Sequence, residues 1–215
     1  TLAKLLVHYY DVTGGSIQVG GQDLRDMNVE ALNDQISYVS QEQFLFNMSL
    51  LENIRLGKPE ATDPEVLAAA EKAQCMEFLA RLPQGIHTMA GDGGKQLSGG
   101  ERQRISLARA ILKDAPIVVL DEATAFMDPE NEEKMNAAIA EIIKGKTVIV
   151  IAHRLHSIVN ADQICVLNNG QVAGIGRHEA LLNCPEYAKL WQAAEGSAAW
   201  GVTANAALEG GIDND

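Results

Sequence analysis

The 215-residue chain is poor in basic residues, cysteines and aromatic residues, and it lacks any long apolar run. Its 17 Lys and Arg residues face 29 Asp and Glu residues. The resulting formal charge of −12 argues against a nucleic-acid-binding surface, which needs a basic footprint. No apolar stretch approaches the roughly 20 residues of a membrane-spanning helix. The three cysteines form no Cys-x-x-Cys pair, which favours reduced thiols over disulfides or a metal site.

A pair of glycines stands at the start of a predicted helix. Ser98 and Glu101 have the spacing of a capping box, so a helix should begin at Ser98. Gly99 and Gly100 then occupy the first turn, where glycine weakens the helix but keeps side chains away from its mouth. Backbone N–H groups and the positive end of the helix dipole are thereby offered to an anion.

The ordinary alternative is a capped helix with a flexible start. The arginines that follow favour the anion-binding interpretation, because the spacing predicts them on a polar face of the helix. They are Arg102, Arg104 and Arg109.

An apolar strand that ends in two carboxylates comes next. Ile117–Leu120 is continuously apolar and rich in β-branched residues, a pattern typical of a strand buried on both faces of a parallel sheet. Asp121 and Glu122 follow at the carboxyl end, where open α/β sheets bind ligands. Neighbouring side chains point in opposite directions, so one carboxylate can serve Mg²⁺ while the other faces a different target. Taken alone, the pair also fits a solvated acidic turn.

These motifs resemble those of the ATP-binding-cassette (ABC) ATPases. Residues 97–101 resemble the signature motif of that family, and residues 117–122 resemble its Walker B motif. Three more stretches resemble the Q-loop, the D-loop and the switch-histidine loop: residues 38–41, 125–128 and 151–155. Five motifs in the family's order, covering most of residues 1–180, argue against coincidence.

The resemblance implies roles for individual residues. Glu122 would be the general base for the water that attacks the γ-phosphate of ATP. Asp121 and Gln41 would hold Mg²⁺, and His153 would stabilise charge on the γ-phosphate. In relatives, the signature glycines act on the nucleotide of a second cassette across a head-to-tail dimer. The implied nucleotide-binding residues are Thr1, Gln41, Ser98, Gly99, Gly100, Glu101 and Asp128.

The resemblance also implies partners and a location. ATP and Mg²⁺ would be bound, a second cassette would complete a homo- or heterodimer, and a transmembrane domain would be fused upstream in the complete protein. Residues 88–94 and Arg154 resemble exporter-type cassettes, so the expected function is ATP hydrolysis coupled to transport at the cytoplasmic face of the cell membrane. The alternatives are a soluble ABC ATPase and a non-catalytic module that offers only its signature face.

The sequence lacks the Gly-Lys-Ser/Thr phosphate-binding loop of the family. Leu2, Leu5, Leu6 and Tyr9 recur at helical spacing, so we expect an amphipathic helix at the start. In relatives this helix follows the loop, and Thr1 would be the threonine just after Gly-Lys-Ser. We therefore expect a chain cut after its P-loop, with an unpaired sheet edge and no ATP hydrolysis of its own.

The order of the patterns predicts an α/β fold. Its core is a P-loop NTPase-like mixed sheet with an inserted ABC α-helical subdomain at about 49–113. Residues 1–195 would form the nucleotide-binding domain, and residues 196–215 a disordered tail. Strands are expected at 16–19, 22–24, 36–40, 117–121, 147–152, 163–167 and 171–173. Helix starts are expected at Ser49, Thr62, Ser98 and Asp128, the last helix having Met135, Ala138, Ile139 and Ile142 on its apolar face and Gly145 as its stop.

Overall fold

A computed structural model describes residues 2–121, 129–152 and 154–195 of the chain. The chain divides into two compact units, Thr1–Ile151 and Ala152–Asp215. Within the described ranges, no helix combines the length and the apolar character needed to cross a membrane.

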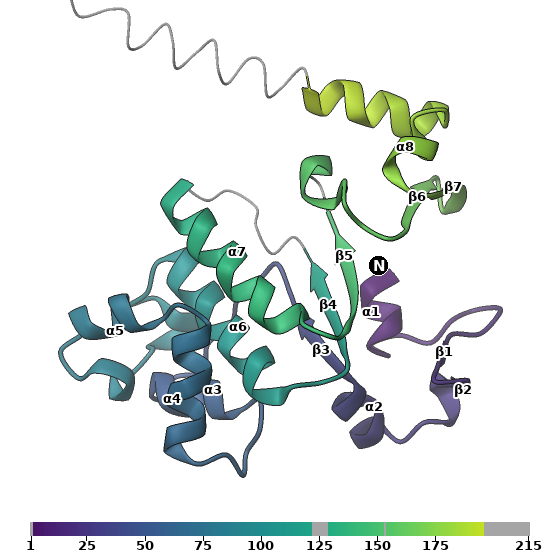
Figure 1. Cartoon of the computed structure of the whole chain (residues 1–215). Coiled ribbons are helices and arrows are strands. Elements are labelled where there is room, and N and C mark those ends of the chain that lie inside the picture. Colours follow the sequence, from purple (N-terminus) through teal and green to yellow (C-terminus); the bar gives the residue numbers. More distant parts are fainter. Residues whose placement is uncertain (1, 122–128, 153, 196–215) are drawn as a thin grey trace, which may run out of the picture. The chain divides into compact units, whose positions relative to one another are not determined.

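A parallel three-stranded sheet forms the centre of the first unit (Figure 1). Its strands lie in the order β3 (Ile36–Val39), β4 (Ile117–Asp121) and β5 (Thr147–Ile151). All three were predicted as strands. Val118 and Val119 of the central strand are fully buried, which confirms the expectation that this strand is covered on both faces.

Helices cover both faces of this sheet (Figure 1). Val119 belongs to a cluster with residues of α1 (Leu2–Leu6) and α2 (Val29–Gln35). Leu120, on the opposite face, belongs to the larger core that also contains α6 (Gly99–Lys113) and α7 (Pro129–Ile143). Successive residues of β4 therefore serve two different cores, as the two-residue period of a strand requires.

The first helix was predicted correctly, but its buried face was not. Leu2 is 56% exposed and Tyr9 is 62% exposed, whereas Ala3 is buried. Leu6 packs only partly against the sheet. A helix this short turns a narrow stripe inward, and the small Ala3 lets the backbone come close to the sheet.

The strand expectation for β5 needs a second correction. Its position is right, yet Ile149 and Val150 are 36% and 45% exposed, so it is not the buried strand that its apolar sequence indicates. In the part of the chain that the structure describes, β5 pairs with β4 alone. A strand at the edge of a sheet leaves part of its surface uncovered.

Residues 49–113 are mainly helical. They contain α3 (Leu50–Arg55), α4 (Asp63–Lys72), α5 (Met76–Arg81) and α6, besides the short 3₁₀ helices Gly85–His87 and Asp92–Gly94. The predicted helix starts are confirmed. The hydroxyl of Ser49 accepts a hydrogen bond from the Glu52 amide at 3.1 Å, and the Thr62 amide donates to the Glu65 carboxylate at 2.7 Å. The assignment of this region as an inserted subdomain stays a prediction.

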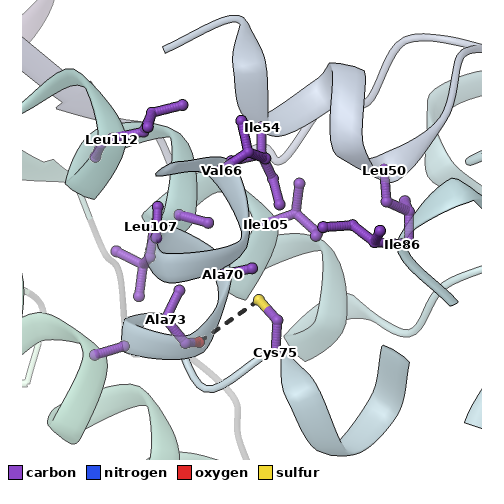
Figure 2. Close-up of a cluster of buried hydrophobic side chains, with 14 of the residues drawn as sticks. Leu50, Ile54, Val66, Ala70, Ala73, Cys75, Ile86, Ile105, Leu107 and Leu112 are labelled. Carbon is purple, nitrogen blue, oxygen red and sulfur yellow. Dashed lines mark hydrogen bonds between the residues drawn. The ribbon is translucent and has the colours of Figure 1, made fainter. Parts of the chain in front are cut away.

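The helices of this region enclose one apolar core (Figure 2). Ile105 and Leu107 of α6 lie beside Val66 and Ala70 of α4, and all four side chains are fully buried. Cys75 lies in the same core, and burial raises the pKa of its thiol to about 12. Its Sγ lies 3.7 Å from the Ala73 carbonyl oxygen.

The helix α7 packs as its sequence predicts. Met135, Ala138 and Ile142 are buried, and Ile139 lies against the same core. Gly145 follows with a φ of +68°, a left-handed conformation that ends helices and favours glycine. Asp128, the predicted cap, lies outside the described residues.

Two predicted hairpins are confirmed, one in each unit. In the first unit, β1 (Gln18–Val19) pairs antiparallel with β2 (Gln22–Asp23). In the second unit, β6 (Ile164–Asn168) pairs antiparallel with β7 (Gln171–Gly176). The Asn169-Gly170 turn between these strands has φ values of 48° and 77°, and two positive φ angles mark a type I′ turn.

The second unit has a small core of its own. It is built from Ile164, Val166, Leu181 and Tyr187. Leu181 ends α8 (His178–Leu181). Nδ1 of His178 lies 2.8 Å from the hydroxyl oxygen of Tyr187, which satisfies a polar group beside the core.

Gly57 generates a prediction about stability. A Cβ at this position would lie 2.2 Å from the carbonyl oxygen of Arg109 in α6, and this oxygen belongs to rigid backbone. We expect Gly57→Ala to lower the free energy of unfolding by about 3 kcal/mol, measured by urea denaturation. Gly14→Ala is the matched control, because nothing lies within 4 Å of its added Cβ. Equal midpoints for the two variants would contradict the close contact.

Candidate nucleotide site

The predicted capping box at Ser98 is present. The Ser98 amide donates to Oε2 of Glu101 at 2.8 Å, and the Glu101 amide donates to the Ser98 hydroxyl at 3.3 Å. Nη2 of Arg81 lies 3.2 Å from the other carboxylate oxygen, Oε1. Both oxygens of Glu101 therefore hold the start of α6 in place, which gives this residue a structural task whether or not it also meets a nucleotide.

None of the described residues packs so closely on Gly99 that a glycine is required there. The atom nearest to an added Cβ is Nη2 of Arg102, at 4.0 Å, which is ordinary contact. Gly99 is exposed and occupies the first helical turn, where N–H groups have no intrahelical acceptor. Among the described residues, no hydrogen bond from the Gly99 or Gly100 amide is found. That this turn is a mouth open to an anion stays a prediction.

The predicted polar face of arginines is wrong. Arg104 is 5% exposed, and its guanidinium lies over the Phe78 ring at 5.3 Å. Arg102 donates to the Leu97 carbonyl at 2.6 Å. Arg109 turns into the space between α6 and α3, where it bonds to Asn53. These three arginines therefore make contacts within the protein around α6.

A second group of candidate residues lies at the carboxyl edge of the sheet. Asp121 ends β4, and Gln41 follows two residues after the end of the neighbouring β3. The Tyr38 hydroxyl donates to Oδ2 of Asp121 at 2.7 Å. Since β3 and β4 are parallel neighbours, their ends meet at one edge, as the sequence predicted for Gln41 and Asp121.

Tyr38 was not among the predicted site residues. Its ring meets the Tyr9 ring edge to face at 6.2 Å, and burial together with the hydrogen bond to Asp121 raises the pKa of its phenol. Tyr38 and Asp121 are 83 residues apart in the chain. The sequence signal is that a tyrosine in a buried strand needs a partner for its hydroxyl.

The two groups are not joined by a described contact. Ser98, Gly99 and Gly100 begin α6, whereas Gln41 and Asp121 end two strands, and no hydrogen bond within the described residues links the groups. The remaining predicted residues lie outside the described residues. They are Thr1, Glu122, Asp128 and His153.

The donor set at the sheet edge fits Mg²⁺. Asp121 supplies a carboxylate, and Gln41 supplies an amide oxygen within the same edge. Mg²⁺ takes one or two carboxylates and otherwise water and phosphate oxygens, rather than a complete protein cage. The described residues contain no cluster of three or more His, Cys, Asp and Glu side chains that could hold a metal ion.

Comparison with known proteins decides the family. The model of the ABC transporter family matches residues 1–125. This chain belongs to the ABC transporter family. The fold agrees, because the structure of a bacterial Atm1-family ABC exporter with ATP bound superposes with a TM-score of 0.83 at 39% identity, over 89% of this chain and 34% of that one.

Curated relatives of this ABC chain are ATP-binding transport proteins. The ATP-dependent lipid A-core flippase of Syntrophus aciditrophicus is 46% identical over 89% of the chain, which spans 32% of that protein. The mycobactin import ATP-binding/permease protein IrtA of Mycobacterium tuberculosis is 46% identical over 92% of the chain, which spans 23% of it. The chain therefore spans about a third or less of the length of these relatives.

Tyr38 generates a prediction about alkaline stability. Its pKa in the folded state lies above the value of about 10 of a free tyrosine, so the folded state holds the phenol proton more tightly. This contribution to stability is complete below pH 10 and is lost as the pH rises above it. We expect the free energy of unfolding of Tyr38→Phe to fall less steeply than that of the parent between pH 10 and 11.5, measured by urea denaturation. Tyr10→Phe, at an exposed tyrosine, should keep the parent's slope. A steep slope retained in Tyr38→Phe would refute the assignment.

Proposed function

We propose that this chain is the ATP-hydrolysing cassette of an exporter-type ABC transporter and works at the cytoplasmic face of a membrane. The observation that carries the proposal is the 39% identity and TM-score of 0.83 with an ABC exporter that was solved with ATP bound. Several relatives are named as ATP-binding/permease proteins. Their names include import and export, so the proposal concerns the exporter-type architecture and not one substrate.

The geometry at the start of α6 supports an anion at this point. Glu101 is committed to the cap and to Arg81, so the Gly99 and Gly100 amides are the groups that remain to meet a ligand. Gly99 has no close packing partner among the described residues, and a glycine there is explained if a ligand from outside comes close to its backbone. We propose that this ligand is the γ-phosphate of ATP held by a second cassette, which makes the active assembly a dimer.

The sheet edge would supply the hydrolytic site. Asp121 and Gln41 would hold Mg²⁺, which neutralises charge on the phosphate oxygens when it is bound. Tyr38 fixes one oxygen of Asp121 and so leaves the carboxylate a single orientation. Glu122 would take a proton from the attacking water, and His153 would stabilise charge on the γ-phosphate. Positioning and electrostatics supply most of the rate in such phosphoryl transfers.

An exposed pair of phenyl rings supports a transmembrane partner. Phe44 and Phe46 are 59% and 52% exposed, and their rings meet edge to face at 5.1 Å. Leu45 between them is fully buried, so the segment holds the two rings outward. Adjacent exposed aromatic rings are typical of contact surfaces. We propose that this surface receives the transmembrane domain.

If the start of α6 binds the phosphate of a second cassette, a substitution at Gly99 should abolish ATPase activity without destabilising the fold. In the complete transporter, Gly99→Asp should remove at least 99% of the ATPase activity, because a carboxylate would stand where the phosphate binds. The fold should hold, since an acidic residue in a first helical turn is favourable. ATP binding by the monomeric cassette should change less than threefold.

Gly99→Ala is the matched control for the added side chain without its charge. It should retain more activity than Gly99→Asp, while both variants unfold within about 1 kcal/mol of the parent. ATP turnover and urea denaturation check these expectations. Loss of ATP affinity by the monomer, comparable to that of a phosphate-loop variant, would refute action across a dimer.

The proposed role of Glu122 as the general base predicts that its substitution traps an ATP-bound dimer. In the complete protein, Glu122→Gln keeps the size and hydrogen bonding of the side chain but cannot accept the proton. ATP should then bind without being hydrolysed, and a dimer should accumulate. Size-exclusion chromatography with Mg-ATP would detect it, with Glu133→Gln on α7 as the control. Turnover at the parent's rate would show that Glu122 is not the base.

A further inference from the structure

Arg109 connects α6 to a segment that is distant in sequence. Its Nε donates to the Asn53 carbonyl oxygen at 2.6 Å, and its Nη2 donates to Oδ1 of the same residue at 2.6 Å. Its Nη1 donates to the Phe44 carbonyl oxygen at 2.9 Å. One planar guanidinium thus holds a helix residue and a loop residue in a fixed geometry, which a lysine ammonium cannot reproduce. Burial lowers the pKa of Arg109 to about 10.

Asn53 extends this network along the loop. It is fully buried, and its Oδ1 also accepts from the Phe46 amide at 2.9 Å. Its Nδ2 lies 3.0 Å from the Phe46 carbonyl, 3.2 Å from that of Met48 and 3.0 Å from that of Ser49. Residues 43–46 belong to no helix or strand, so side chains supply the hydrogen-bond partners that neighbouring backbone supplies in regular secondary structure.

The backbones of α3 and α6 also meet at Arg109. Gly57, just after α3, approaches the Arg109 carbonyl so closely that a Cβ would lie 2.2 Å away. Side chain and main chain of Arg109 therefore fasten the same two segments. The open helix mouth at Gly99 lies ten residues earlier on the same rigid helix, or about 15 Å along its axis.

We propose that Arg109 and Asn53 are positioning residues, which tie the phenyl pair Phe44–Phe46 to α6 and thereby to the helix mouth at Gly99. A partner that displaces the phenyl pair then displaces the helix as well. The contacts of Arg109 alone link the phenyl pair to α6. The transmission of a signal to ATP hydrolysis rests on the proposed function.

The first experiment tests the tie without ATP. Hydrogen exchange of the full-length protein would be measured by mass spectrometry for Arg109→Lys and for the control Arg55→Lys. Arg55 is a matched arginine because its guanidinium bonds to Glu52, Asp63 and the Ala61 carbonyl, none of them in the loop. We expect exchange in residues 44–49 to rise at least tenfold in Arg109→Lys only, with α4 unchanged in both.

Two results would overturn the tie. One is unchanged exchange at residues 44–49 in Arg109→Lys, and the other is an equal rise throughout residues 50–113, which would mean a purely structural role. If Arg109→Lys does not fold, Asn53→Asp serves in its place, since it keeps Oδ1 for Arg109 and loses the Nδ2 donor. It should then free residues 46–49, and unchanged exchange there would refute the tie.

The second experiment tests the transmission with Mg-ATP turnover. Phe46→Ala should lower turnover of the parent, but should change it less than twofold in the Arg109→Lys background. In the Arg55→Lys background it should act as it does in the parent. If the fold-reductions in turnover caused by Phe46→Ala and Arg109→Lys multiply in the double variant, the two changes act independently, and this would refute the transmission. A parent without ATPase activity would refute the proposed function, and the exchange experiment would still decide the tie.

Discussion

The burial of α6 is the constraint on which the first unit depends. Ile105, Leu107 and Ala108 are completely buried, and the helix packs against α3, α4 and α7 at once. Because three neighbours fix it, its exposed first turn has one direction and one position. Glycine makes the backbone of the first turn at Ser98–Gly100 flexible. The packing of the rest of α6 nevertheless fixes the position of this turn. The cost of the glycines is offset by the capping box and by the core beneath the rest of the helix.

The sheet contributes a different kind of order. Val119 and Leu120 in β4 face two separate cores, so the strand cannot slide by one residue without exposing both sets of side chains. Asp121 comes directly after them, so the register of β4 also fixes its position at the end of the strand. Tyr38 then restrains the carboxylate by a hydrogen bond to one of its oxygens. Burial of apolar residues thereby determines where a charged group stands at the edge of the sheet.

Local features were predictable from the sequence, whereas distant contacts were not. The caps at Ser98 and Thr62 and the Asn169-Gly170 turn depend on residues within four positions of one another, so their patterns are sufficient. The inward turn of Arg109 depends on Asn53, 56 residues earlier, and the Tyr38 contact joins residues 83 apart. Helical spacing alone predicted the arginines on a polar face. A guanidinium can be buried where carbonyl groups or an aromatic ring contact it, and helical spacing does not reveal these distant partners. The exposure of β5 likewise depends on its neighbours in the sheet and not on its own apolar residues.

The setting of Cys75 has a practical consequence for chemical labelling. Its thiolate is suppressed at neutral pH, since burial raises the pKa of this thiol to about 12 and closes access to it. Cys165 is exposed, and it lies on β6 of the second unit. A maleimide dye would therefore attach to the second unit and spare the core of the first. Cys184, the third free cysteine, is partly exposed and also belongs to the second unit, so a thiol-reactive dye distinguishes the second unit from the first without replacement of Cys75.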